Sequence, residues 1–140
     1  KQKTAYEIRP RDWSSDVCSS DLGGGAVPKP PAVAPYPFVE PPAPLTTDAA
    51  VLQHGETLFI QECSRCHQFG PSVTPDLRKL NAGLHAMFND SVLKGAVAPT
   101  GMESFSDILS PAEVEAIHAY LINEGWKGWR EQEAARSKTP

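Results

Sequence analysis

The stretch Cys63-Ser64-Arg65-Cys66-His67 decides the fold. Two thiols three residues apart, followed directly by an imidazole, can attach to both vinyl groups of one haem while the imidazole reaches the iron. A structural zinc site usually has a second Cys/His pair, and a thioredoxin-like redox pair usually lies in a βαβ unit. The sequence around this motif lacks both and is typical of helices and loops. The motif therefore predicts one covalently attached haem c, with a zinc or redox module as the alternatives.

Only part of the 140-residue chain has the composition of a folded domain. Residues 1–47 cannot form a core, and most of the 14 prolines lie between Pro28 and Pro44. A segment as short as 48–125 is marginal as a folded unit, and a covalent haem adds to its core. We therefore expect a haem domain at 48–125 and a polar tail at 126–140.

The first residues do not look like part of this domain. The stretch Arg11–Leu22 resembles a translated synthetic adapter that recurs in proteins assembled from environmental DNA. We expect residues 1–22, with the odd cysteine Cys18, to be an artefact or a disordered end. No secretory signal begins at Lys1, although haem c is attached on the periplasmic side in bacteria, so we expect a C-terminal fragment of a longer, periplasmic protein.

Residues 23–47 have the composition of a linker. Three glycines are followed, from Ala26 to Leu45, by a polyproline-like run that is extended and stiff. We expect it to act as a tether. Tyr36, Phe38 and Val39 are apolar enough to lie against a neighbouring surface, so the tether can wrap around the domain.

The periodicity of residues 48–125 predicts an all-α fold with three main helices around the haem. The first helix is expected from Thr47 or Asp48 toward Cys63, with Gly55 at a close helix crossing and a buried stripe that includes Val51. The second is expected over 81–94 and the third from the capping residue Ser110 to a stop at Gly125. Trp126 and Trp129 are expected on a partner surface or in an exposed tail.

Two further residues complete the expected haem site. Met87 falls within a predicted helix, whereas Met102 lies in an irregular apolar loop, so Met102 is the candidate sixth ligand opposite His67. The other ring nitrogen of His67 is expected to donate to a carbonyl, for which Pro75 is the best candidate. Outside this site, the remaining histidines lack paired ligand spacing and are expected to face solvent: His54, His85 and His118.

Charge and composition exclude several classes of function. The net charge of −4 and the acidic balance of residues 48–125 disfavour nucleic-acid binding. No run of 18 apolar residues is present, so we expect no membrane span. No catalytic triad, phosphate loop or carboxylate pair indicates hydrolase or transferase chemistry.

Residues 48–125 resemble a class I cytochrome c. The resemblance rests on matching residues along this segment: Gly55, Phe59, CSRCH at 63–67, Pro75-Asp76-Leu77, the Met102 loop, Ile117 and Tyr120. It implies that the first and last helices cross at Gly55, and that Pro75 provides the carbonyl that orients the haem histidine.

A narrower resemblance covers the C-terminal half. The stretch from Leu93 to Ile122, with its proline-rich tether and tryptophan-containing tail, resembles the C-terminal haem c domain of quinohaemoprotein alcohol dehydrogenases. That family joins such a domain to a β-propeller that holds pyrroloquinoline quinone (PQQ) and calcium. One residue departs from the family, which usually reads Gly-Met-Pro-Ser-Phe: Glu103 replaces the proline.

The resemblance implies a function in electron transfer without substrate chemistry of its own. The domain would accept single electrons from a reduced PQQ domain of the same parent chain. It would pass them to a soluble cytochrome, a cupredoxin or a membrane quinone pathway. A freestanding periplasmic electron carrier is the alternative, and if Met102 is not a ligand, a haem-based sensor or peroxidase-like protein is a third possibility.

Overall fold

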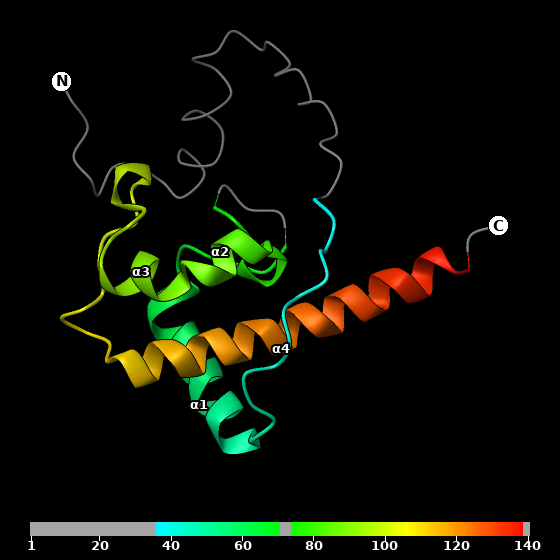
Figure 1. The fold of residues 1–140 in the computed structure, drawn as a ribbon, viewed down its shortest axis with the longest axis horizontal. Coiled ribbons are helices and arrows are strands. Elements are labelled where there is room, and N and C mark those ends of the chain that lie inside the picture. The colour runs from blue at the N-terminus through cyan, green and yellow to red at the C-terminus, as the bar shows by residue number, and fades with distance from the viewer. Residues whose placement is uncertain (1–35, 71–73, 139–140) are drawn as a thin grey trace, which may run out of the picture. The chain divides into compact units, whose positions relative to one another are not determined.

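The computed structural model describes residues 36–70 and 74–138, which lie in one compact unit. The expectations for residues 1–22, for Cys18 and for the linker before Tyr36 fall outside the described residues. Within them the secondary structure is helical and contains no strand (Figure 1). The predicted all-α fold is therefore confirmed.

The first helix leads directly into the CSRCH motif at 63–67. Helix α1 spans Ala49–Leu58, and the Asp48 side chain caps it by accepting a hydrogen bond from the Ala50 N–H. It continues as a wider π-helical turn, η1, over Phe59–Cys63. The predicted run from the cap at Asp48 to Cys63 is thus confirmed, with a change of helical pitch before the first cysteine.

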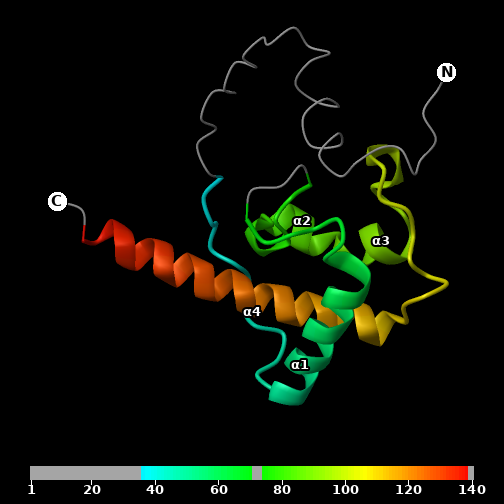
Figure 2. The ribbon, with the colours of Figure 1, turned by 180° about the vertical axis from the view of Figure 1, so that it is seen from behind.

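Helix α1 crosses the last helix, α4, which spans Pro111–Arg136 (Figures 1 and 2). The two helices approach closely at Gly55. A Cβ atom at Gly55 would lie 2.1 Å from the backbone oxygen of Ala116, so only glycine allows this approach. Next to the crossing, the Phe59 ring lies 5.7 Å from that of Tyr120 and 5.0 Å from that of Phe69. The expected reason for Gly55 is therefore the correct one.

The middle of the domain differs from the single helix expected over 81–94. Helix α2 spans Ala82–Ala86, with the Asn81 side chain as its cap, and helix α3 spans Phe88–Leu93. The helix is interrupted between them at Met87, whose backbone angles, φ −100° and ψ 11°, are not helical. Gly95 ends this segment with φ +64°, as a helix-stopping glycine should. Short 3₁₀ turns, η2 and η3, lie at Leu77–Lys79 and Ala98–Thr100.

Helix α4 spans Pro111–Arg136 and is much longer than expected. Its predicted start is confirmed, because Ser110 and Glu113 form a capping box. Its predicted stop at Gly125 is wrong. A Cβ atom there would lie 2.9 Å from the backbone oxygen of Arg78, so Gly125 serves a close contact within the helix and not a helix end.

The core lies between α4 and the shorter helices. The buried apolar residues of α4 include those that the periodicity predicted: Val114, Ile117, Ala119, Tyr120 and Leu121. The same cluster also includes Leu58, Phe59, Phe88 and Val92 from α1, η1 and α3, and Leu80 and Leu109 from the connecting segments. Val51 is 37% exposed and does not belong to the buried stripe, since it lies near the free end of α1.

The described part of the proline-rich segment packs against α4 (Figure 1, cyan). The Phe38 ring lies over Gly128, and the Trp126 Nε1–H donates a hydrogen bond of 2.9 Å to the Pro42 carbonyl. Trp126 also contacts Trp129 edge to face. The two tryptophans are therefore partly buried within the domain itself.

No helix in the range 36–70 or 74–138 has both the length and the apolar character needed to span a bilayer.

Candidate functional site

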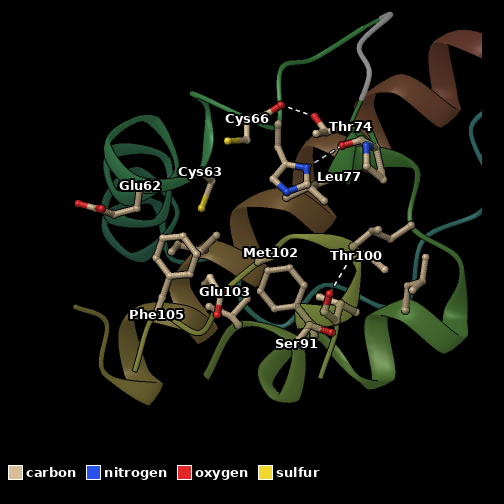
Figure 3. A pocket seen from close by; sticks show the side chains of 18 of the residues that line it. Glu62, Cys63, Cys66, Thr74, Leu77, Ser91, Thr100, Met102, Glu103 and Phe105 are labelled. Carbon is tan, nitrogen blue, oxygen red and sulfur yellow. Dashed lines mark hydrogen bonds between the residues drawn. The ribbon is translucent and has the colours of Figure 1, made fainter. Parts of the chain in front are cut away.

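A cavity of about 480 Å³ opens next to the CSRCH motif at 63–67 (Figure 3). Its volume is within the range of about 300–1,000 Å³ for cofactor and ligand sites. Its wall is mostly apolar and comes from η1, η2, α2, α3, α4 and the Met102 loop: Leu77, Leu80, Leu84, Phe88, Val92, Val97, Met102, Phe105, Leu109 and Ile117. Such a wall suits a large, flat, apolar group.

Both cysteines of the motif line this cavity (Figure 3). Cys63 is partly buried at the end of η1, whereas Cys66 is exposed. Burial, and secondarily the charge of Glu62, raises the pKa of Cys63 to about 11. At neutral pH the Cys63 thiol is therefore protonated.

His67 also lines the cavity, and its predicted partner Pro75 holds the imidazole ring. Its Nδ1 lies 3.0 Å from the Pro75 carbonyl oxygen, which can only accept, so Nδ1 carries the proton. The bond leaves Nε2 as the ring nitrogen that can bind a metal. The Thr74 hydroxyl donates to the Cys66 carbonyl and ties the same loop to the motif.

Met102 lines the cavity, and Met87 does not. Two hydrogen bonds attach the Met102 loop to α3: Phe105 N–H donates to the Val92 carbonyl, and the Ser104 hydroxyl donates to the Leu93 carbonyl, both at 2.8 Å. Gly101, at φ +99°, supplies the left-handed turn directly before Met102. The structure thus brings together all the residues predicted for the site.

The residues present fit a haem. Leu84 is 39% exposed although it lines the cavity, and a bound macrocycle would cover such apolar surface. Across 36–70 and 74–138, no cluster of three or more histidine, cysteine or acidic side chains is placed to hold a metal ion, and no strand flanks the motif. Within these residues, the zinc and redox-pair alternatives find neither the ligands nor the sheet that they need.

Two histidines that the sequence predicted to face solvent are buried or half-buried in the structure. His85 is 8% exposed, and its Nδ1 lies 2.9 Å from Nε2 of His118, although both were expected in solvent. The His118 ring also stacks on Phe88, a wall residue of the cavity, at 4.3 Å between ring centres. The two histidines lie 33 positions apart in the sequence, and nothing in the intervening pattern could reveal this pair.

The histidine pair makes stability depend on pH. Burial lowers the pKa of His85, and burial together with the charge of His85 lowers the pKa of His118 to about 4. Because the unfolded chain takes up protons on these residues first, the free energy of unfolding should fall as the pH drops from about 6.5 to about 4. Chemical denaturation at several pH values should show this fall in the wild type and a smaller one in His118→Gln. His54→Gln, at an exposed position, should leave the slope unchanged; equal slopes in all three proteins would contradict the prediction.

The chain is similar to one family profile and to several known proteins. The profile of the family described as cytochrome C oxidase, cbb3-type, subunit III matches residues 50–121. Quinohemoprotein alcohol dehydrogenases ADH IIB and ADH-IIG of Pseudomonas putida are 38% and 40% identical over 111 residues, which is 77% of this chain. The cytochrome c6 of Cyanidium caldarium is 34% identical over 86 residues, which is 58% of this chain and 78% of that protein.

A solved structure agrees with these sequence matches. The structure of quinohemoprotein alcohol dehydrogenase ADHIIG from Pseudomonas putida HK5 superposes with a TM-score of 0.60 at 38% identity, covering 79% of this chain and 17% of that one. The chain spans only 16% and 15% of the lengths of the two Pseudomonas putida dehydrogenases.

Proposed function

Because this chain belongs to the cytochrome c family, we propose that it carries single electrons through one covalently attached haem c. Its fold is the all-α fold of class I cytochromes c. The observation that carries the proposal is the shared cavity, which collects the thiols, the imidazole and the thioether of the predicted site. The assigned roles are thioether anchors for Cys63 and Cys66, axial ligands for His67 and Met102, and orienting carbonyl for Pro75.

The chain's own residues orient the ligands of such a site and keep water away from it. A bound haem c supplies an iron that takes up and releases one electron. The Pro75 carbonyl fixes the tautomer and the plane of the His67 ring and makes its Nε2 more basic. The apolar wall excludes water from one side, and the bonded Met102 loop keeps the thioether at the cavity, so little has to move when the charge changes.

The electron donor we propose is a PQQ dehydrogenase domain of the same parent chain. The matched dehydrogenases are several times longer than this chain, and the similarity extends over 77% of this chain, which is more than residues 48–125 alone. In this proposal residues 23–47 link the two domains, PQQ and calcium lie in the other domain, and the protein is periplasmic. The acceptor is a soluble cytochrome, a cupredoxin or a membrane quinone pathway.

A freestanding periplasmic electron carrier is the second candidate. It is favoured by the cytochromes c6, small proteins of which this chain covers about three quarters. Reading the native gene upstream of residue 23 separates the two: a long β-propeller sequence supports the dehydrogenase, and a secretory signal supports the carrier.

Covalent haem attachment tests the central proposal. The chain should be expressed in the periplasm together with a haem-attachment system and then run on a denaturing gel stained for haem. We expect a stained band at the size of the chain, and none for the variant with both Cys63→Ala and Cys66→Ala. A wild-type band without haem, in cells that load a control cytochrome, would refute the proposal.

Glu103 allows a prediction about the reduction potential. It lines the cavity directly after Met102 and is exposed (Figure 3). Its negative charge favours the more positively charged, oxidised iron, so Glu103→Gln should raise the potential. Glu103→Pro should raise it at least as much, because it removes the same charge and restricts the loop. Voltammetry checks both, with Glu115→Gln on the exposed side of α4 as the control; equal potentials in all variants would contradict the role of this charge.

A further inference from the structure

Arg78 lies between two parts of the chain that serve different purposes. On one side are residues 36–42, here called the strap, which cross α4 (Figure 1). On the other side is the loop that carries Pro75, the partner of His67. The contacts of Arg78 reach both.

The strap is docked at defined points. Its Phe38 ring occupies the notch at Gly128, where a Cβ atom would come within 2.3 Å of the ring. The Gln132 side chain bonds to both polar groups of the Phe38 backbone: it accepts from the N–H at 2.8 Å and donates to the carbonyl at 2.9 Å. The Lys79 ammonium donates to the Tyr36 carbonyl at 2.6 Å. A proline-rich segment loses little conformational freedom on such docking.

Arg78 connects the strap to the loop that carries Pro75 through its planar guanidinium. That group lies 5.3 Å from the centre of the Phe38 ring and 4.2 Å from that of the Phe69 ring, both within the range of cation–π contacts. Its Nε and Nη2 donate to the two carboxylate oxygens of Asp76 at 3.0 and 2.7 Å. An arginine fork can make these contacts together, and a lysine cannot.

Asp76 extends the contacts of Arg78 to the loop that carries Pro75. Its side chain is 5% exposed and also accepts a hydrogen bond of 3.0 Å from the Gly70 N–H, so it joins both ends of the loop that follows the motif. Burial raises the pKa of Asp76, but the bonds from Arg78 and Gly70 outweigh this and hold the pKa below its ordinary value. The residue before it, Pro75, carries the carbonyl that holds His67.

We propose that Arg78 is a positioning residue for the haem iron, which couples the docked strap to the hydrogen bond between His67 and Pro75. The inference rests on the proposed function, since it takes His67 as the axial ligand. The strap then has a second role beside connecting domains: its docking sets the reduction potential of the haem. An event upstream that pulls the strap from α4 would change how readily the haem accepts an electron.

The direction of the effect follows from the ligand chemistry. A histidine whose free nitrogen donates to a carbonyl is a more basic ligand and stabilises the oxidised iron. When the strap or Arg78 no longer supports the loop, this bond weakens and the potential should rise. A purely Coulombic influence of Arg78 would depend only on its positive charge.

Two substitutions that leave the net charge unchanged separate positioning from charge. Phe38→Ala removes the ring from both Gly128 and Arg78, and Arg78→Lys keeps the charge but loses the fork. Each should be made in the full chain with haem attached. Tyr36→Ala is the matched control, because the Tyr36 side chain is 64% exposed and only its backbone takes part in docking.

Two measurements read the result. Voltammetry should show a higher reduction potential in Phe38→Ala and Arg78→Lys and no change in Tyr36→Ala. Hydrogen exchange at His67 Nδ1–H, followed by NMR in the reduced protein, should be about two- to tenfold faster in the first two variants, as expected for a weakened hydrogen bond. A lower thermal midpoint alone, with potential and exchange as in the wild type, would overturn the inference.

Failure of the inference is distinguishable from failure of the proposed function. If no variant and no wild-type chain carries covalent haem, the proposed function fails. If haem is attached in all of them and Phe38→Ala behaves like the wild type, the strap has no part in setting the potential and the inference fails alone.

Discussion

Met102→Ala is expected to lower the reduction potential by a large part of the roughly 0.8 V that axial ligands span. The thioether of methionine favours the reduced iron and raises the potential of a histidine-ligated haem. In the proposed site, in which Met102 is the sixth ligand, alanine would leave that position open to water or to a small ligand. Haem attachment should persist, because Cys63 and Cys66 are untouched, so the effect can be measured on a loaded protein.

The measurement combines voltammetry with carbon monoxide binding to the reduced protein. Met102→Ala should bind carbon monoxide rapidly, and the wild type slowly. Met87→Ala is the matched control: Met87 lies at the break between α2 and α3, outside the cavity, and its loss should leave both readouts unchanged. Rapid binding by the wild type, with a potential equal to that of Met102→Ala, would instead favour the sensor or peroxidase-like alternative.

Gly55→Ala is expected to destabilise the domain by about 3 kcal/mol, at the upper end of the range for overpacking. Its added methyl carbon would lie 2.1 Å from the Ala116 oxygen and 2.6 Å from the Ala116 carbonyl carbon. These are backbone atoms within α4 and cannot rotate away, so α1 and α4 must separate. Because α1 leads into Cys63, the haem cavity would be disturbed as well.

Denaturant unfolding of the haem-loaded chain measures this effect. Gly83→Ala is the matched control, since the nearest atom to an added Cβ there is Asn81 Oδ1, at 3.4 Å. In helix α2 it should be neutral or stabilising by up to about 1 kcal/mol. A loss below about 1 kcal/mol in Gly55→Ala would show that the crossing adjusts easily and that the glycine is not required there.

The local features of the chain were predictable because their causes are local. The Ser110 capping box, the Asp48 cap and the stop at Gly95 each depend on residues within one turn, and all three are confirmed. The stop expected at Gly125 is wrong because a glycine permits both a helix end and a close packing contact. Only the neighbour, here the Arg78 backbone, decides between the two.

The break at Met87 has a similar explanation. Leu84, Phe88 and Val92 lie on one helical repeat, so the sequence predicts a single helix. In the structure Leu84 and Phe88 line the cavity from separate helices, α2 and α3. A wall that bends around a flat group needs such a break, and periodicity along one chain segment cannot report it.

By itself, the sequence determined the class of fold and the family and predicted the chemistry of the site. The motif at 63–67 predicts a haem partner because two thiols and an imidazole at that spacing match one macrocycle, and helical periodicity with caps predicts the all-α domain that the structure shows. Only the tertiary structure decided which distant groups meet: His85 with His118, Phe38 with Gly128, and Arg78 with both the strap and the His67 loop. The physical reason is that such contacts depend on how helices cross and how closely their backbones approach, and these distances are set by packing among residues far apart in the chain.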